Sequence, residues 1–523
     1  MTKTTRRFAI GAGILLGVGV VFLAEEHIRG ALELHAWQRA MRAKGEKLTI
    51  AELTPVITNL ASRVIAPGEA AGLLGRATAP QDCPTAMQIV APGKARVAWA
   101  LSNWRSENGS RFTNDWNAPS LASAFRSLRE VLPALRSDLT NRAFIIGVDY
   151  EQGFDPRLMH AHVVGYYKAA HALRADTVLA LHEHRLDEAT ENLVAGAALV
   201  RLMKEERFMK SHLLCHVATE LLQGATWETL QADGWTDAQL SAIQAGWESP
   251  DLIESLLQAY GMERAMSCTY YYDRDRCSNR KLIETVLNPH GLGSINPGRA
   301  SENLLTELLG GLDDASKPVR AKLEIAVWRL AWADQDQLVY CESVQRLIDS
   351  GRRAVAGRKS PLGHPPGTVA DDDPLFSTIG LPPMSAYNRM RYLLTPWIFF
   401  GTQEQLQKAI QAETVRELTL AAVALKRYQL RHGRLPEKLT ALVPEIVREV
   451  PRDWYNGQSL HYRPNADGSY LLYSVGEDGR DDGGDPTPRD QNQRTARFYS
   501  GRDLVWPMPA TPEEVKAAEV RKR

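Results

Sequence analysis

The sequence has few cysteines, no net charge and only one long hydrophobic run. Its five cysteines are scattered over 523 residues, which excludes a disulfide scaffold or a zinc ribbon; only Cys268 and Cys277 lie close enough in sequence to suggest a local bridge. Lysine plus arginine and aspartate plus glutamate number 62 each, so no net positive field draws the chain to nucleic acid. We therefore expect no nucleic-acid partner.

Common catalytic signatures are also missing. The chain contains no Gly-x-Ser-x-Gly nucleophile elbow, no His-Glu-x-x-His zinc helix and no Gly-x-x-x-x-Gly-Lys phosphate loop. We name no catalytic residue and no cofactor-binding residue on this basis. The sequence favours a non-enzymatic role and leaves enzymatic activity open.

The single hydrophobic run stands at the N-terminus. An uncharged apolar stretch, residues 8–24, follows a basic tip, residues 1–7, and precedes Glu25 and Glu26. At about 1.5 Å per helical residue the run reaches the short end of what spans a bilayer. Basic flanks stay in the cytoplasm. We expect a single-pass inner-membrane protein with a cytoplasmic N-terminus and the bulk of the chain outside the cytoplasm.

A cleaved signal peptide is the alternative reading of this run. No Ala-x-Ala-like site closes it, and its apolar core is long for the hydrophobic region of a signal peptide. These features favour an uncleaved anchor, although the sequence does not decide whether cleavage occurs.

Beyond the anchor the sequence predicts a mainly α fold in successive parts. Amphipathic helical periodicity runs through residues 121–350, and "HEHRLDEA" reads as the turn of a helical hairpin that resembles a tetratricopeptide junction, with Ala189 as its small residue. The predicted divisions are a juxtamembrane and irregular segment, 25–120; a repeat-like helical array, 121–350; a Pro/Gly-rich linker, 351–402; a small α+β module, 403–503; and a charged tail, 504–523.

The C-terminal module combines a long helix with two strand-like runs. The helix pattern from Gln403 ends at Gly433, where glycine suits a helix stop. The runs "QSLHYRP" and "SYLLYSV" flank "NADG", which predicts a β-hairpin. The loop "GEDGRDDGGD" follows at once.

This order of elements resembles the C-terminal part of the major pseudopilins of type II secretion, over about residues 412–485. The resemblance implies a loop that binds Ca²⁺ through carboxylates and backbone carbonyls, and Ca²⁺ prefers six to eight oxygen ligands. A solvated acidic turn, with glycines that permit positive φ, remains the alternative. The carried-over ligands are Asp478, Asp482 and Asp485, with Ser474 and Asp481 as further candidates.

Two departures from the pseudopilin pattern matter. The family's Asp-Pro-Trp-Gly motif appears here without its proline, as Asp453-Trp454-Tyr455-Asn456-Gly457. The anchor is separated from the module by most of the chain and has no prepilin cleavage site, so pilus assembly is not expected. The chain as a whole resembles a family of membrane-anchored bacterial proteins with a helical middle, and that resemblance implies no particular activity.

Two functions follow as hypotheses. The first is an envelope scaffold that is held in the membrane by residues 8–24, binds protein partners on the concave surfaces of its helical array and is stabilised by calcium at its C-terminal module. The second is an envelope hydrolase with a histidine-containing metal site. His212 and Glu220 lie about 12 Å apart along one helix, too far to share a zinc ion. The hydrolase hypothesis rests on six histidines in one helical region: His160, His162, His182, His184, His212 and His216.

Overall fold

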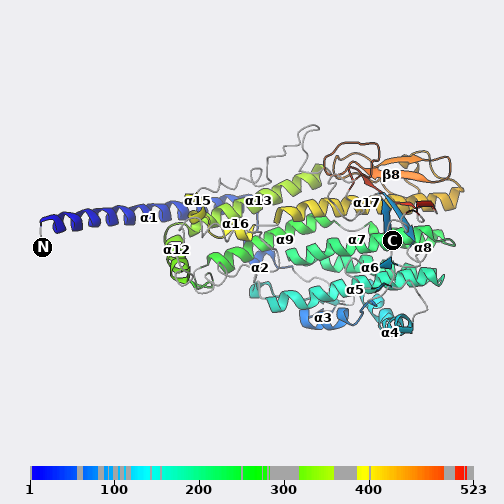
Figure 1. Ribbon diagram of the computed structural model, residues 1–523, viewed down its shortest axis with the longest axis horizontal. Helices are drawn as coiled ribbons and strands as arrows, with labels where there is room; N and C mark the ends of the chain where they lie inside the picture. The colour runs from blue at the N-terminus through cyan, green and yellow to red at the C-terminus, as the bar shows by residue number, and fades with distance from the viewer. Residues whose placement is uncertain are drawn as a thin grey trace.

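The computed structural model shows a mainly helical, elongated molecule from which one long helix projects (Figure 1). It describes residues 3–55, 63–80, 87–91, 93–97, 104–105, 111–112, 119–141, 144–153, 156–248, 251–273, 275–279, 282, 317–357, 386–399, 402–487, 501–511, 513–514 and 517.

Helices form most of the described chain, as the apolar periodicity predicted. The α-helices are α1 (Lys3–Ala43), α2 (Ile50–Leu53), α3 (Pro67–Gly75), α4 (Pro119–Thr140), α5 (Pro156–His182), α6 (Leu186–Lys204), α7 (Met209–Gln231), α8 (Asp237–Trp247), α9 (Leu252–Ser267), α12 (Lys317–Ala331), α13 (Ala333–Gly357), α15 (Ala386–Arg391), α16 (Thr395–Ile398) and α17 (Thr402–His432). Shorter helical turns are η2 (Tyr150–Gln152), the π-turn η3 (Cys268–Tyr272) and η6 (Leu439–Leu442).

The strands are short and form small sheets. β1 (Arg63–Ile65) pairs in parallel with β6 (Phe144–Ile146), and β4 (Trp104–Arg105) pairs antiparallel with β5 (Arg111–Phe112). One three-stranded sheet has the order β10-β3-β2 and the other β7-β8-β9. Their strands are β2 (Met87–Ala91), β3 (Lys94–Val97), β7 (His461–Pro464), β8 (Tyr470–Ser474), β9 (Leu504–Val505) and β10 (Met508–Pro509).

Local signals in the sequence explain several helix ends. Thr236 caps α8, because its hydroxyl accepts from the Gln239 N–H while the Gln239 side chain accepts from the Thr236 N–H. Gly433 follows the last residue of α17 and has φ +69°, a conformation in which glycine carries no Cβ penalty. α5 and α6 fold back on each other around the turn at residues 183–185, where the hairpin was expected.

The largest core unites the helical array with the C-terminal segment. α6 and α7 pack on α5, and α17 packs on α7, α8 and α9, so buried residues of α17 such as Leu418 and Leu425 share one cluster with Leu222 and Trp227 of α7. The predicted division between an array and a module at residue 403 thus falls at the start of a helix that packs against the array. The long helix assigned to that module is a central helix of the array.

Two further predicted divisions fall within or next to regular secondary structure. α13 extends to Gly357, so the segment from 351 begins as helix; residues 358–385 of the predicted linker lie outside the described residues. The predicted charged tail begins with β9 and β10; Val505 of β9 and Trp506, between the two strands, are buried. β10 pairs in parallel with β3, and the Trp227 indole donates to the Pro507 carbonyl at 2.7 Å, which ties this end of the chain to α7.

The suggested bridge between Cys268 and Cys277 is wrong. Neither residue takes part in a disulfide bond among the described residues. The Cys268 Sγ lies 3.4 Å from the Cys341 Sγ instead, because η3 packs against α13. The fold thus places two cysteines that are far apart in the sequence next to each other.

Glycines in α6 permit the close packing of the array. A Cβ on Gly196 would lie 2.4 Å from the Leu222 Cδ2 of α7, whereas a Cβ on Gly72, in the middle of α3, would meet nothing within 4 Å. Overpacking a core costs about 1–3 kcal/mol, and replacing a helical glycine with alanine contributes up to about 1 kcal/mol of stability.

We expect Gly196→Ala to lower the free energy of unfolding or leave it unchanged, and Gly72→Ala to raise it. Chemical denaturation of the full chain in detergent compares the two variants. If Gly196→Ala stabilises the protein as much as Gly72→Ala does, α6 and α7 are not packed as closely as described.

Candidate functional site

Polar side chains converge in the core around Glu206, in the turn between α6 and α7. Its carboxylate accepts hydrogen bonds from the Tyr166 and Ser211 hydroxyls, and its Oε2 lies 3.1 Å from the His162 Nε2. The His212 Nε2 lies 3.0 Å from the Glu206 backbone carbonyl. All of these residues are buried. One carboxylate thus organises side chains from α5 and α7.

The electrostatics of this cluster follow from burial. Burial and the neighbouring Glu206 carboxylate raise the pKa of Tyr166, so its hydroxyl stays protonated and donates. Burial lowers the pKa of His212 to about 4 and that of His216, one turn along α7, to about 3. Both imidazoles are therefore neutral at pH 7. Within the described part of the chain, neither ring nitrogen of His216 has a hydrogen-bond partner.

The structure separates the six histidines on which the hydrolase hypothesis rested. His162 and His212 meet at Glu206, and His216 is buried beside them. His182 and His184 are exposed at the far end of α5, and the side chain of His160 lies outside the described residues. Among the described residues, no three His, Cys, Asp or Glu side chains are grouped to hold a metal ion. The cluster is a buried polar network around one carboxylate, in which the Nδ1 atoms of His162 and His212 have no hydrogen-bond partner among the described residues.

The aspartate loop is organised by a residue that sequence reasoning missed. Asp503, just before β9, is buried, and its carboxylate accepts from the backbone N–H groups of Asp482, Gly484 and Asp485 at 3.4, 2.7 and 3.0 Å. Burial raises the pKa of Asp503. No spacing pattern marks Asp503, because its loop partners precede it by about twenty residues.

Three of the candidate calcium ligands bind their own loop. Asp478 Oδ1 accepts from the Arg480 N–H, and Asp485 Oδ1 from the Thr487 N–H and hydroxyl. Asp481 Oδ1 accepts from the Gly483 N–H and the Tyr473 hydroxyl, both at 2.9 Å. The Gly483 N–H bond is the main cause of the lowered pKa of Asp481.

The other two candidates face different surroundings. Ser474 is buried on β8 and donates to Asp453 Oδ1 at 2.9 Å, while the Asp482 side chain is exposed. Ca²⁺ needs six to eight oxygens at one point. The described loop instead directs three N–H groups inward at the Asp503 carboxylate, and the side chains of Asp478, Asp481 and Asp485 accept from backbone N–H groups of the same loop. As arranged, these residues do not assemble a calcium cage, and calcium stays a prediction.

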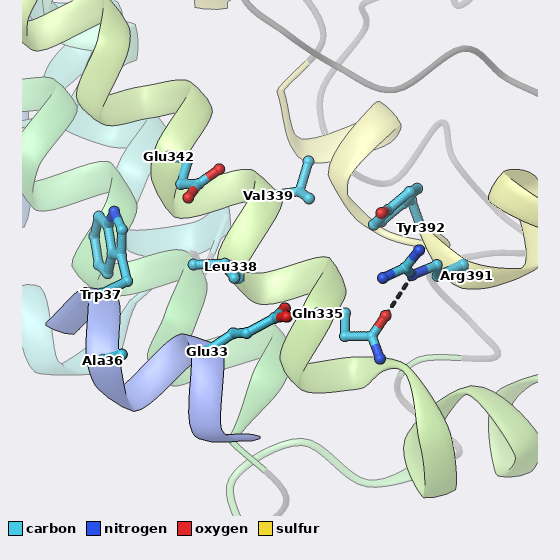
Figure 2. A pocket seen from close by; sticks show the side chains of 9 residues that line it. All are labelled: Glu33, Ala36, Trp37, Gln335, Leu338, Val339, Glu342, Arg391 and Tyr392. Carbon is cyan, nitrogen blue, oxygen red and sulfur yellow. Dashed lines mark hydrogen bonds between the residues drawn. The ribbon is translucent and has the colours of Figure 1, made fainter. Parts of the chain in front are cut away.

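A pocket of about 440 Å³ lies between α1 and α13. Figure 2 shows the side chains that line it. Ala36, Leu338 and Val339 give it apolar walls. Its polar groups are the carboxylates of Glu33 and Glu342 and the guanidinium of Arg391, which donates from Nε to the Gln335 side chain. Trp37 lines the same pocket. The pocket thus combines an aromatic ring with charges of both signs.

A buried carboxylate joins α1 to the body close to the end of the apolar run. Glu26 is 3% exposed, and its Oε2 accepts from the Trp332 indole at 3.1 Å and from the Gln335 amide at 2.9 Å. The same amide donates to the Glu26 backbone carbonyl at 2.7 Å. Gly30 allows the close approach of α13, since a Cβ there would lie 2.6 Å from the Gln335 Cγ. We call these contacts the Glu26 clamp.

Farther along, Glu46 binds Arg352 of α13, and the Arg264 side chain of α9 donates to the Lys47 carbonyl at 2.9 Å. Glu26 therefore meets the beginning of α13 and Glu46 its end, so the two helices run in parallel along the body. Before the clamp, α1 is exposed, with apolar side chains such as Leu15, Leu16 and Val21 open to the surroundings. One helix is thus both a free apolar rod and a packed core helix.

Comparison of the chain with models of protein families, with curated proteins and with solved structures finds no match in any of the three. The pseudopilin resemblance is therefore still a prediction, and function is inferred from the chain's own geometry.

The buried histidines predict a pH-dependent stability. Their folded-state pKa values, about 3 and about 4, lie below the value of about 6.5 for an unfolded histidine. The unfolded chain therefore binds more protons in this range, and the free energy of unfolding falls as the pH drops from 6.5 toward 4.

We expect His216→Phe to flatten this fall by about 1.4 kcal/mol per pH unit, because one protonation event is removed. Denaturant titrations of the full chain at pH 4.5, 5.5 and 7.5 measure it. His35→Phe, at an exposed histidine of α1, is the matched control and should leave the slope unchanged. Equal slopes for wild type and His216→Phe would mean that His216 is not buried and neutral.

Asp503 rather than Asp482 should hold the aspartate loop. Asp503→Ala removes the acceptor of three backbone N–H groups and is expected to lower the free energy of unfolding by about 2–4 kcal/mol, whereas Asp482→Ala, at an exposed side chain, should change it by less than about 0.5 kcal/mol. Denaturation of the full chain checks both.

The same measurement tests calcium when it is repeated with calcium and with chelator. Saturation at about 100 times the dissociation constant adds about 2.7 kcal/mol to the stability of a binding protein. A rise of that size that Asp482→Ala abolishes would support the calcium loop. Identical curves would leave Asp503 as the group that orders it.

Proposed function

We propose that the protein is a single-pass, membrane-anchored envelope scaffold whose helical body lies outside the cytoplasm and binds protein partners. The observation that carries the proposal is the continuity of α1. Its first half is apolar and exposed, and its second half is fixed in the core by the Glu26 clamp. A helix of this length and composition can cross a membrane.

The packing of α1 against the body distinguishes an uncleaved anchor from a cleaved signal peptide. A cleaved leader has no need to contact the mature body, yet Leu23, inside the apolar run, packs against the cluster that holds Trp328 and Trp332. The same helix continues without a break into the clamp, where Glu26 accepts from the Trp332 indole and the Gln335 amide. This supports an uncleaved anchor.

The orientation follows from charge. Arg6 and Arg7 stand before the apolar stretch and acidic residues follow it, so the positive-inside tendency favours a cytoplasmic N-terminus. The body then lies on the other side of the inner membrane.

The pocket beside α1 supports a binding role. The carboxylates of Glu33 and Glu342 and the guanidinium of Arg391 offer charges of both signs to the polar side chains of a protein partner. The Trp37 ring gives the pocket an aromatic wall and already holds the Arg264 guanidinium 5.8 Å from its centroid. Stacked helical hairpins supply further surface for such partners. Calcium at the aspartate loop would add stability to this scaffold and is tested above.

A hydrolase is the second candidate, and the convergence of His162, His212 and Ser211 at Glu206 is the observation in its favour. Each of these side chains is fully buried, whereas a hydrolase must admit substrate and water. The scaffold accounts better for the same network, since a satisfied buried carboxylate fixes how α5 and α7 pack.

The anchor is tested by charge placed in the apolar half of α1. Leu16→Arg combined with Val18→Arg should move the chain from the carbonate-resistant membrane fraction to the soluble fraction or abolish its accumulation, because each arginine at the centre of a span costs about 2.5–3.5 kcal/mol. Leu430→Arg, at an exposed leucine of α17, is the matched control and should remain in the membrane fraction.

Protease added to spheroplasts tests the orientation. The body should be digested in intact spheroplasts while a cytoplasmic marker survives. A body protected until the cells are lysed, or a wild-type chain extracted by carbonate, would contradict the proposal.

A further inference from the structure

The body begins at the level where the apolar run of α1 ends. Leu23, within the run, packs against the cluster that contains Trp328 and Trp332, and Glu26 binds Trp332 directly. Glu26 lies two residues beyond the run, about 3 Å along a helix. Trp332 is therefore held at the membrane surface once α1 spans the bilayer, and no stalk separates body from membrane.

α12 leads into Trp332 and carries exposed leucines. Leu323 and Leu330 are 67% and 61% exposed, and their spacing of seven residues places them on one face of the helix. Ile325 and Trp328, on the other side, are buried in the core. Figure 1 shows α12 at the end of the body from which the apolar half of α1 projects, running across the line of α1 in this view.

α15 adds to the same end of the body. It packs against α12 and α13, and Tyr387 meets the Trp332 ring edge-on at 5.9 Å between centroids. Tyr387 and Met390, three residues apart, are each 42% exposed. We call Leu323, Leu330, Tyr387 and Met390 the membrane-end patch.

We propose that the membrane-end patch rests in the headgroup region of the bilayer that α1 spans, so that α12 is an in-plane, interfacial helix and the body has a second contact with the lipid surface. The proposal rests on the anchor role of α1 proposed above. The bilayer is the surface that covers this patch because Tyr387 contacts Trp332, and Trp332 binds Glu26 close to the end of the apolar run. Exposed leucines with a charged neighbour suit an interfacial helix.

Lys322 is a further residue of α12 that suits contact with lipid. It is exposed next to Leu323, and a lysine at an interface keeps its ammonium near lipid phosphates while its stem covers apolar surface. Tyr387 likewise has the amphipathic ring that is enriched at membrane interfaces. The partner inferred is thus a bilayer surface with anionic lipid.

The test is photocrosslinking of the full chain in vesicles of phosphatidylcholine with phosphatidylglycerol. A benzophenone amino acid replaces one exposed residue at a time: Leu323, Leu330, Val18 within the span, or Leu430 on α17. Because all four positions are exposed, the replacements should leave the fold intact, which thermal melting of each variant checks. Mass spectrometry identifies the adducts.

We expect lipid adducts at 18, 323 and 330, with a yield at 323 and 330 severalfold above that at 430. Adducts at 18 but only background at 323 and 330 would overturn the interfacial contact and leave the anchor intact. Adducts that join two protein chains at 323 and 330 would also overturn it, since a second copy would then cover the patch. Background at all four positions would refute the anchor and, with it, this inference.

Discussion

The Glu26 clamp is the interaction on which the rest of the arrangement depends. A carboxylate so close to an apolar span is costly to bury, because an unpaired charge in a medium of low dielectric is strongly disfavoured. Here it is tolerated because the Arg29 guanidinium pairs with it and because Trp332 and Gln335 both donate to it. The pairing fixes the rotation of α1 about its axis as well as its depth, since only one face of the helix carries Glu26 and Gly30.

In the anchored protein that we propose, rotation and depth together would set the position of the body relative to the membrane. α13 runs parallel to α1 from the clamp to the contact between Glu46 and Arg352, and α9 packs on α13. Asp336, near the start of α13, accepts from the N–H groups of Leu394 and Thr395 at 2.8 and 3.1 Å, which holds the segment after α15. The pocket between α1 and α13 is thus built on a rigid frame, so that a partner bound there would be held at a defined height.

Sequence reasoning succeeded where the signal is local. Periodicity identified the helices of the array, Thr236 marked the start of α8 and Gly433 the end of α17, because capping and helical repeat act over a few residues. It failed where the partner is distant. Glu26 meets residues about 306 positions away, and β10 pairs with a strand more than 400 residues earlier, and neither pairing leaves a pattern that one sequence can reveal.

The candidate sites show the same difference between local signals, which the sequence reveals, and long-range contacts, which it does not. The aspartates of the loop were visible as a cluster, but the group that orders them is Asp503, which stands alone in the sequence. Histidines were counted by sequence region, although burial, not proximity along the chain, distinguishes His162, His212 and His216 from the exposed His182 and His184. A buried carboxylate organises the structure around it when several hydrogen-bond donors reach it, and the tertiary fold decides which donors do. The buried acids Glu26, Glu206 and Asp503 are therefore better guides to this molecule than its exposed acidic loop.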